Sequence, residues 1–296
     1  MSNFPQSSVA KKANPLAGYM RQPKIYIGLP SNGAYWTKGS IEMPDNRELA
    51  VYSMTAKDEL AFKTPDALMN GQAIVDVIQS CIPAIKDAWK CPNVDFDMIL
   101  IAIRIATYGE MMEVSHTVPN TEIEVEHQID LRVLLDQLVN NSKWEDQVEI
   151  NDQLTCYVRP LTYRHMTMTS LKTFETQRLM QAVTDDNIDE EKKLEIFNKS
   201  FNKMTDITID LISDSVSAIK TPDTVVDDPA FIREFVANAD KDVFQKIQKH
   251  LDKMKGTNGI QPMTVTASPE QVEAGAPETY ELPISLDNSD FFAKGS

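Results

Sequence analysis

The sequence predicts an α+β fold, with a mixed first half and a mainly helical second half. Three observations support this. Residues 96–105 are apolar on nearly every helical face, which is typical of a helix buried on all sides, whereas residues 112–129 alternate with the period of strands. From residue 162 onward, apolar residues recur every three or four positions over long stretches. We therefore expect short β-hairpins around a buried helix, then a long helical hairpin and a small terminal strand pair.

Four segments are expected along the chain. They are a disordered basic arm, an α+β domain, a helical domain, and a terminal strand pair with a two-phenylalanine tail, at residues 1–22, 23–160, 161–260 and 261–296. The arm is rich in Ser, Asn and Pro and has no periodicity, which is typical of chain that is disordered when alone.

In the first half, period-two patterns and turn residues mark the strands. The expected strands cover residues 24–29, 41–43, 48–54, 112–118, 123–129, 148–150 and 154–158. Strand 41–43 is expected to pair with 48–54 across the turn at 44–46. Helices are expected from Thr55, over 68–82 after a restart at Thr64-Pro65-Asp66, over 95–109 and over 131–138. Asp95 is expected to cap the third of these, and Gly109 to end it.

The second half is expected to be helical over residues 162–182, 188–219, 231–236 and 240–254, followed by strands 263–266 and 279–284. The second of these helices carries an apolar stripe at 3/4 spacing, formed by Leu194, Phe197, Phe201, Met204, Thr208, Leu211, Ser215 and Ala218. This stripe either packs on the preceding helix as an antiparallel hairpin or forms a seam with a partner or a second copy. The polar residues Thr208 and Ser215 disfavour a strong free-standing coiled coil.

The charge of the chain is uneven. There are 29 Lys and Arg residues and 44 Asp and Glu residues, a net charge of −15. Residues 1–41 hold five of the basic residues and none of the acidic ones, which leaves −20 on the remainder. An acidic body disfavours nucleic-acid binding, because neutralising phosphates supplies most of that affinity. The basic arm is expected either to lie on an acidic protein surface or to act as a solubilising tail.

No motif of catalysis, cofactor binding or metal binding is found in the sequence. Gly28 and Gly33 have the spacing of a phosphate loop but lack its Lys-Ser/Thr, and neither G-x-G-x-x-G nor G-x-S-x-G occurs. Three cysteines, an odd number, favour a reducing compartment and small buried thiols, and none pairs with a His at zinc-finger spacing. No apolar run is long enough to span a bilayer, and no signal-peptide apolar region follows the N-terminus. We expect a protein that is not an enzyme and has no cofactor and no bound metal.

Candidate partner-binding residues come from four places. They are Lys11, Lys12 and Arg21 of the arm; Tyr35 and Trp36 of a loop; Phe197, Phe201, Met204 and Leu211 of the stripe; and Phe291 and Phe292 of the tail. The loop aromatics either pack locally or anchor a partner. The terminal phenylalanines tuck either into the fold or into a neighbour. Arg104, a charge inside the buried helix, either pairs with a local carboxylate such as Asp97 or Asp87 or anchors a partner.

Several runs together resemble a known family. The residues that carry the resemblance are Tyr35-Trp36-x-x-Gly39, 48–60 (ELAVYSMTAKDEL), 64–71 (TPDALMNG), Ser80-Cys81, 97–106 (DMILIAIRIA), Tyr108-Gly109, 129–131 (IDL), Ser217-x-Ile219, Pro229-x-x-Ile232-x-x-Phe235 and the closing 286–292. The chain thereby resembles the baseplate hub and hub-assembly proteins of contractile-tailed, T-even-like bacteriophages, over about residues 25–292. The family pattern would place cysteine knuckles within residues 112–129 and near 265–281, but these stretches hold no cysteine here. A metal-ribbon role is therefore not expected for this chain.

The resemblance implies a late, non-enzymatic protein that helps to build the tail baseplate. Its partners would be hub, tail-tube or tape-measure proteins in an oligomeric assembly, with no nucleic acid and no membrane. It would be found in the host cytoplasm during assembly and then in the virion tail. The alternative is a tail-assembly chaperone that holds the tape-measure protein and is not retained, and a cryptic enzyme is the weakest possibility.

Overall fold

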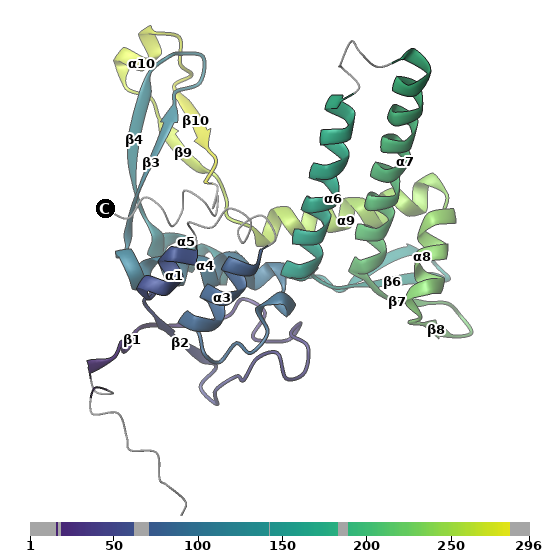
Figure 1. Cartoon of the computed structure of the whole chain (residues 1–296), viewed down its shortest axis with the longest axis horizontal. Coiled ribbons are helices and arrows are strands. Elements are labelled where there is room, and N and C mark those ends of the chain that lie inside the picture. Colours follow the sequence, from purple (N-terminus) through teal and green to yellow (C-terminus); the bar gives the residue numbers. More distant parts are fainter. Residues whose placement is uncertain (1–15, 17–18, 62–70, 142, 183–188, 285–296) are drawn as a thin grey trace, which may run out of the picture.

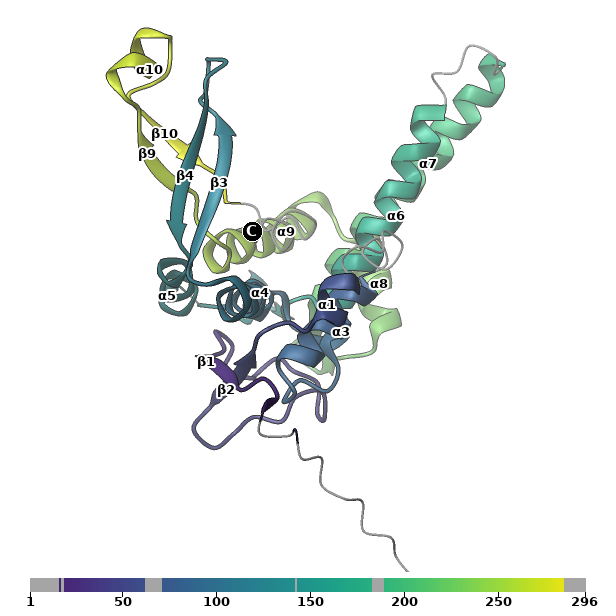
Figure 2. The same cartoon turned by 60° about the vertical axis from the view of Figure 1, so that its left-hand side comes forward.

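The computed structural model describes residues 16, 19–61, 71–141, 143–182 and 189–284, and it confirms the α+β fold class. Figures 1 and 2 show a central body from which two projections rise. One is the helical hairpin of α6 (Tyr163–Ala182) and α7 (Glu190–Ser215), called the arm below. The other is built mainly of strands.

The body contains one strand pair and several helices. Its elements are β1 (Pro23–Gly28), β2 (Glu48–Tyr52), α1 (Ala56–Ala61), α3 (Gln72–Cys81), the short 3-10 helix η2 (Ala88–Lys90), α4 (Asn93–Tyr108) and α5 (Leu131–Asn141). The start of α1 follows its sequence signal, because the Asp58 carboxylate accepts hydrogen bonds from the backbone N–H and the hydroxyl of Thr55. The expected restart at residues 64–66 lies outside the described residues.

The expected pairing of residues 41–43 with 48–54 is wrong. Strand β2 instead pairs antiparallel with β1, and Ile41 forms an isolated bridge with Ile85. The physical reason is the length of the alternative: β1 offers β2 a register from Pro23 to Gly28, whereas residues 41–43 offer only three positions.

Helix α4 is the centre of the body. Its buried residues run almost without a break from Val94 to Ala106, which confirms the predicted burial on all sides. Gly109 ends it with a φ of 95°, a conformation that glycine adopts at little cost. Arg104 is buried, with its guanidinium carbon 5.4 Å from the centroid of the Tyr108 ring.

Asp95 does not cap α4, which corrects the prediction. The residue before the helix is Pro92, so Asp95 falls inside the first turn and its side chain points to the loop at residues 31–36. Its carboxylate accepts hydrogen bonds from the Ser31 N–H at 2.8 Å, the Ser31 hydroxyl at 2.5 Å and the Trp36 indole N–H at 2.7 Å. Burial raises the pKa of Asp95, and these hydrogen bonds oppose that rise.

The strand projection consists of two hairpin-like pairs that lie side by side (Figures 1 and 2). They are β3 (Met111–Thr117) with β4 (Glu124–Asp130), and β9 (Met263–Thr266) with β10 (Thr279–Leu282), the second pair enclosing the short helix α10 (Pro269–Glu273). Both pairs were expected. A small core of Val118, Val265 and Tyr280 joins them, and the Tyr280 hydroxyl hydrogen-bonds with His116 Nε2 at 3.0 Å.

The second large core lies under a four-stranded antiparallel sheet. Its strands, in order, are β5 (Gln147–Asn151), β6 (Leu154–Val158), β7 (Val216–Lys220) and β8 (Val225–Val226), covered by α8 (Pro229–Asn238) and α9 (Lys241–Asn258). Asp228 and Asp240 cap these two helices, accepting hydrogen bonds from the backbone N–H groups of Ala230 and Val243.

The predicted helix over residues 188–219 is therefore too long. It ends at Ser215, and residues 216–220 become strand β7. The last stripe positions, Ser215 and Ala218, are too weakly apolar to define a helical face, whereas Val216 and Ile219 suit a strand and complete the edge of β6. A boundary at residue 160 would separate β6 from β7, which are hydrogen-bonded neighbours.

Aromatic packing fixes the base of the arm to the body. The Tyr163 ring of α6 stacks on Phe96 of α4 at 4.5 Å between centroids and on Trp89 at 5.6 Å. Gly71, before α3, approaches the same turn so closely that a Cβ there would lie 3.0 Å from side-chain atoms of Tyr163 and Thr167. Its φ of 78° also favours glycine. These contacts hold the first turns of α6 against the body.

Candidate interaction surface

The seam between the two helices of the arm contains two small polar side chains as well as the buried Ile207. Thr176 of α6 is fully buried and Ser200 of α7 nearly so, and each lies midway along its helix. The Thr176 hydroxyl donates to the Lys172 carbonyl oxygen of its own helix at 2.7 Å, so it needs no partner from α7. Small residues let the helices approach closely, but they bury little apolar area.

Ion pairs join the helices along one side of the arm. Lys203 Nζ lies 3.4 Å from Glu175 Oε2, and Lys172 Nζ lies 3.7 Å from Asp210 Oδ2. Asp210 Oδ1 also accepts a hydrogen bond from Arg233 Nε of α8 at 2.8 Å. These charges are partly exposed, so each pair stabilises the arm by less than about 1 kcal/mol. This side of α7 is thus polar and engaged in contacts within the chain.

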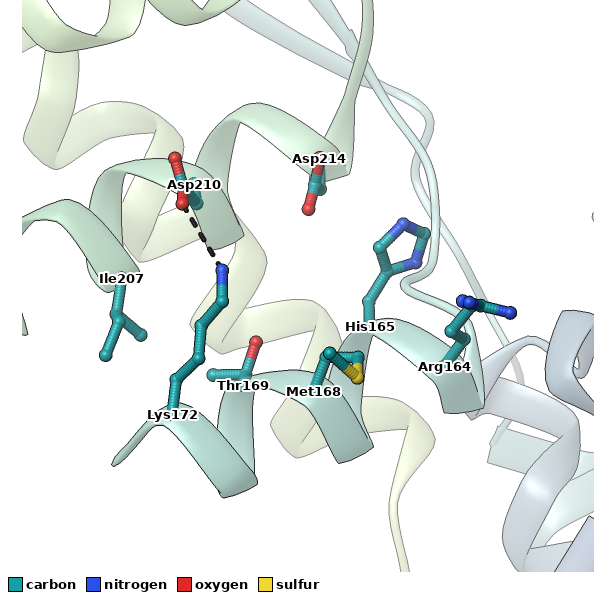
Figure 3. A pocket seen from close by; sticks show the side chains of 8 residues that line it. All are labelled: Arg164, His165, Met168, Thr169, Lys172, Ile207, Asp210 and Asp214. Carbon is teal, nitrogen blue, oxygen red and sulfur yellow. Dashed lines mark ion pairs between the residues drawn. The ribbon is translucent and has the colours of Figure 1, made fainter. Parts of the chain in front are cut away.

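A pocket of about 290 Å³ opens on that polar side near the base of the arm (Figure 3). Its lining residues are Arg164, His165, Met168, Thr169, Lys172, Ile207, Asp210 and Asp214. Burial lowers the pKa of His165, whose Nδ1 accepts a hydrogen bond from the Thr162 N–H at 3.2 Å. Among the lining residues, Lys172 and Asp210 form an ion pair, and Asp210 also accepts the hydrogen bond from Arg233 of α8.

The other side of α7 carries large apolar side chains that nothing in the described chain covers. Leu194 is 61% exposed, Phe197 47% and Phe201 62%. Met204 and Leu211 continue this face at 3/4 spacing towards the base and are half-buried. These five residues are called the α7 stripe below. Exposed apolar residues gathered on one face are typical of an interaction site.

The structure bears on the two alternatives for this stripe. An antiparallel hairpin does form between α6 and α7, but Thr176 and Ser200 lie in its seam, and the outer stripe residues do not. The spacing of apolar residues in the sequence predicted the stripe, but it did not predict that Thr176 and Ser200 lie in the seam. The signal for the seam was weak: small residues at helical spacing, which occur equally on solvent-facing positions.

The loop aromatics, by contrast, pack locally. Trp36 is buried with its indole N–H bonded to Asp95, and the Tyr35 hydroxyl donates to Asp146 Oδ1 at 2.7 Å. The Tyr35 ring meets Trp144 edge-on at 6.2 Å. Of the two alternatives for Trp36, the geometry is that of local packing. Tyr35 remains partly exposed and stays a predicted contact residue.

Arg21 also lies against its own chain. Its guanidinium donates to the carbonyl oxygens of Ser53 and Ser80, both at 2.5 Å, and lies 3.7 Å from Asp58 Oδ2. These contacts fix the chain just before β1 to the ends of β2 and α3. The other residues predicted in the N-terminal basic segment and in the tail lie outside the described residues. They are Lys11, Lys12, Phe291 and Phe292.

The part of the chain that the structure describes has few features typical of catalytic or metal-binding sites. There, no group of three or more His, Cys, Asp or Glu side chains is placed to hold a metal ion, and no helix is both long and apolar enough to cross a membrane. Cys81, Cys91 and Cys156 are buried free thiols, as predicted. Burial raises the pKa of Cys81 to about 12 and of Cys156 to about 11, so neither is an activated nucleophile.

Comparison with protein families gives a match over most of the chain. The family model described as T4 bacteriophage base plate protein matches residues 38–267, which include most of the body, the whole described arm, the four-stranded sheet and strand β9. The search of curated proteins found no match, and the search of solved structures found none either.

Proposed function

Because this chain belongs to the T4 bacteriophage base plate protein family, we propose that it is a structural or assembly protein of the hub region of the phage tail baseplate, acting through protein–protein contacts. The family supports a structural role in the baseplate and a place in the virion tail. The hub location, the contractile tail and late expression are proposals that rest on the resemblance of residues 25–292.

The α7 stripe is the observation that carries the contact role. It places three exposed large apolar side chains on a helix that projects from the body, within the part of the chain that matches the family. Leaving such a face in water is unfavourable by about 25 cal/mol per Å² of apolar surface. Covering it on assembly recovers that free energy, so the stripe is suited to join a neighbouring tail protein.

The proposed partners are hub, tail-tube or tape-measure proteins, met in the host cytoplasm while the baseplate is built. A role without catalysis is supported by the raised pKa values of the Cys81 and Cys156 thiols, which are therefore not activated nucleophiles. The second candidate, a chaperone that holds helices of the tape-measure protein, is favoured by the same stripe, because an amphipathic helix is a natural occupant of an apolar helical face.

A protein inventory of finished particles tests the proposal. The gene is disrupted in the phage, and particles and assembly intermediates from disrupted and intact phage are compared by mass spectrometry and electron microscopy. We expect this chain at a fixed ratio to other baseplate proteins in intact particles, and no complete baseplates without it. Absence from particles with baseplates still lost would favour the chaperone. Normal baseplates without the chain would overturn both.

A further inference from the structure

The stripe-bearing stretch of α7 is electrically neutral, although the chain as a whole is acidic. Residues 190–208 hold four acidic side chains and four basic ones, so the stretch is neutral, whereas the whole chain carries −15. A surface that receives a strongly charged partner is normally of opposite charge. A neutral surface on an acidic protein is instead suited to meet a copy of itself, since the two copies do not repel there.

The stripe is also self-complementary when two α7 helices run antiparallel. With residue 199 of each copy at the two-fold axis, Leu194 lies opposite Met204 of the second copy, and Phe197 lies opposite Phe201. Each aromatic ring thus meets an aromatic ring, and each aliphatic side chain meets a flexible thioether. Such mutual pairing is the defining property of a two-fold interface.

Polar residues agree with this register. Thr208 lies at the end of the overlap rather than at its centre. Lys199 lies on the axis, but at a helical position that faces away from the stripe, so the two ammonium groups are not forced together.

The projection of the arm gives room for this arrangement. The overlap of residues 190–208 is about 28 Å long at 1.5 Å per residue. An antiparallel pair places one body at each end of this overlap. A parallel pair would place two acidic bodies side by side, and their repulsion would oppose it.

We propose that two copies of this chain pair through their α7 stripes, antiparallel about residue 199. The inference rests on the proposed function in that it names the first partner of the same surface, and the dimer is then the unit that enters the baseplate. The pairing covers Leu194, Phe197 and Phe201, the stripe residues that the single chain leaves most exposed.

Analytical ultracentrifugation of the purified full chain over a concentration series tests the pairing. We expect a dimer for the wild type and a monomer for the double variant Phe197→Ser/Phe201→Ser. The matched control is Phe174→Ser, which removes a ring from α6 that is 52% exposed but is not part of the stripe. It should remain a dimer. Circular dichroism of all three proteins checks that the arm stays helical.

Cysteine cross-linking tests the register. In the antiparallel pair, Leu194→Cys/Met204→Cys places two thiols of different copies together, and mild oxidation should give a covalent dimer. Leu194→Cys alone leaves the two introduced thiols ten residues apart along the pair, about 15 Å, and should not cross-link. If Leu194→Cys cross-links without the second cysteine, the two helices run parallel, and the proposal is overturned.

A wild-type protein that is monomeric at every concentration, or a dimer unaffected by the double variant, would also overturn it. If the monomer nevertheless enters baseplates through the stripe, the occupant is another tail protein. In that case the self-pairing fails while the proposed function stands.

Discussion

Helices α4 and α7 both carry large apolar side chains, but those of α4 are buried and those of the α7 stripe are largely exposed. Almost every apolar residue of α4 is covered by its own chain. In contrast, Leu194, Phe197 and Phe201 of α7 face outward, and the small residues Thr176 and Ser200 lie in the seam of the arm. Burial within the chain stabilises the fold of α4. On α7 the same kind of residue contributes little to the fold and remains available for another surface.

The largest expected effect separates these two helices directly. Ile101→Ala in α4 should reduce the free energy of unfolding by about 2–5 kcal/mol, because it leaves a cavity in a fully packed core. Phe201→Ala in α7 should change the free energy of unfolding of the monomer by less than about 1 kcal/mol, since in the single chain the ring is mostly in water. Urea unfolding of both variants measures the difference, and equal losses would erase the distinction between core and arm.

The next effect probes the polar centre of the body. Asp95→Ala should cost about 2–4 kcal/mol, because the Ser31 and Trp36 N–H groups lose a charged acceptor while they stay buried. The control is Asp45→Ala, which removes an exposed carboxylate and should stay within about 0.5 kcal/mol of the wild type. Denaturant midpoints of both proteins decide the matter. If Asp95→Ala unfolds at the wild-type midpoint, the loop at residues 31–36 is not held by this residue.

A smaller effect should be confined to the arm. Ser200→Leu introduces a large side chain into a seam built for small ones, at a cost of about 1–3 kcal/mol. Hydrogen exchange should accelerate in α6 and α7 and remain unchanged in α4, because the seam belongs to the arm alone. Faster exchange of the α4 amides would mean that the arm and the core unfold as one unit.

The smallest effect concerns pH. Burial raises the pKa of Asp97 to about 6, and within the described part of the chain its carboxylate has no hydrogen bond or ion pair. A group whose folded pKa is raised stabilises the protein below its unfolded pKa, near 3.9, and loses that contribution as the pH rises through about 6. Asp97→Asn should therefore raise the free energy of unfolding by about 1–2 kcal/mol at pH 7, and by almost nothing near pH 4.

Melting temperatures of Asp97→Asn and the wild type across this pH range test the sign. The matched control is Asp76→Asn on α3, which changes an exposed carboxylate that contacts Gln72. It should show no such pH-dependent gain. A gain for Asp97→Asn that persists unchanged at pH 4 would contradict the assignment of the effect to the buried charge.

Much of the fold was predictable because local signals agreed with tertiary packing. The all-apolar pattern of α4 and the alternation in β3 and β4 each agree with the elements that formed. The failures arose where long-range pairing decided the outcome. The helical spacing of the apolar residues continues to Ala218, yet residues 216–220 form strand β7, which pairs with β6.

The candidate surface was predictable in part for the same reason. The spacing of Phe197, Phe201 and Met204 identified a face of one helix, but it carried no information on whether α6 would cover that face. Thr176 and Ser200 decide that, and nothing local to either residue marks it as a seam position. Trp36 was misleading because an indole in a Gly-containing loop looks exposed until its distant acceptor, Asp95, is located.

The central claim is that the α7 stripe serves assembly and not folding. The most direct test is to replace the gene in the phage with the Phe197→Ser/Phe201→Ser variant and to measure its amount in finished particles, alongside its melting temperature as a purified protein. We expect a loss of the chain from particles, with Phe174→Ser incorporated normally, and an unchanged melting temperature when both proteins are measured at a concentration at which they are monomers. Wild-type incorporation of the double variant would contradict the claim.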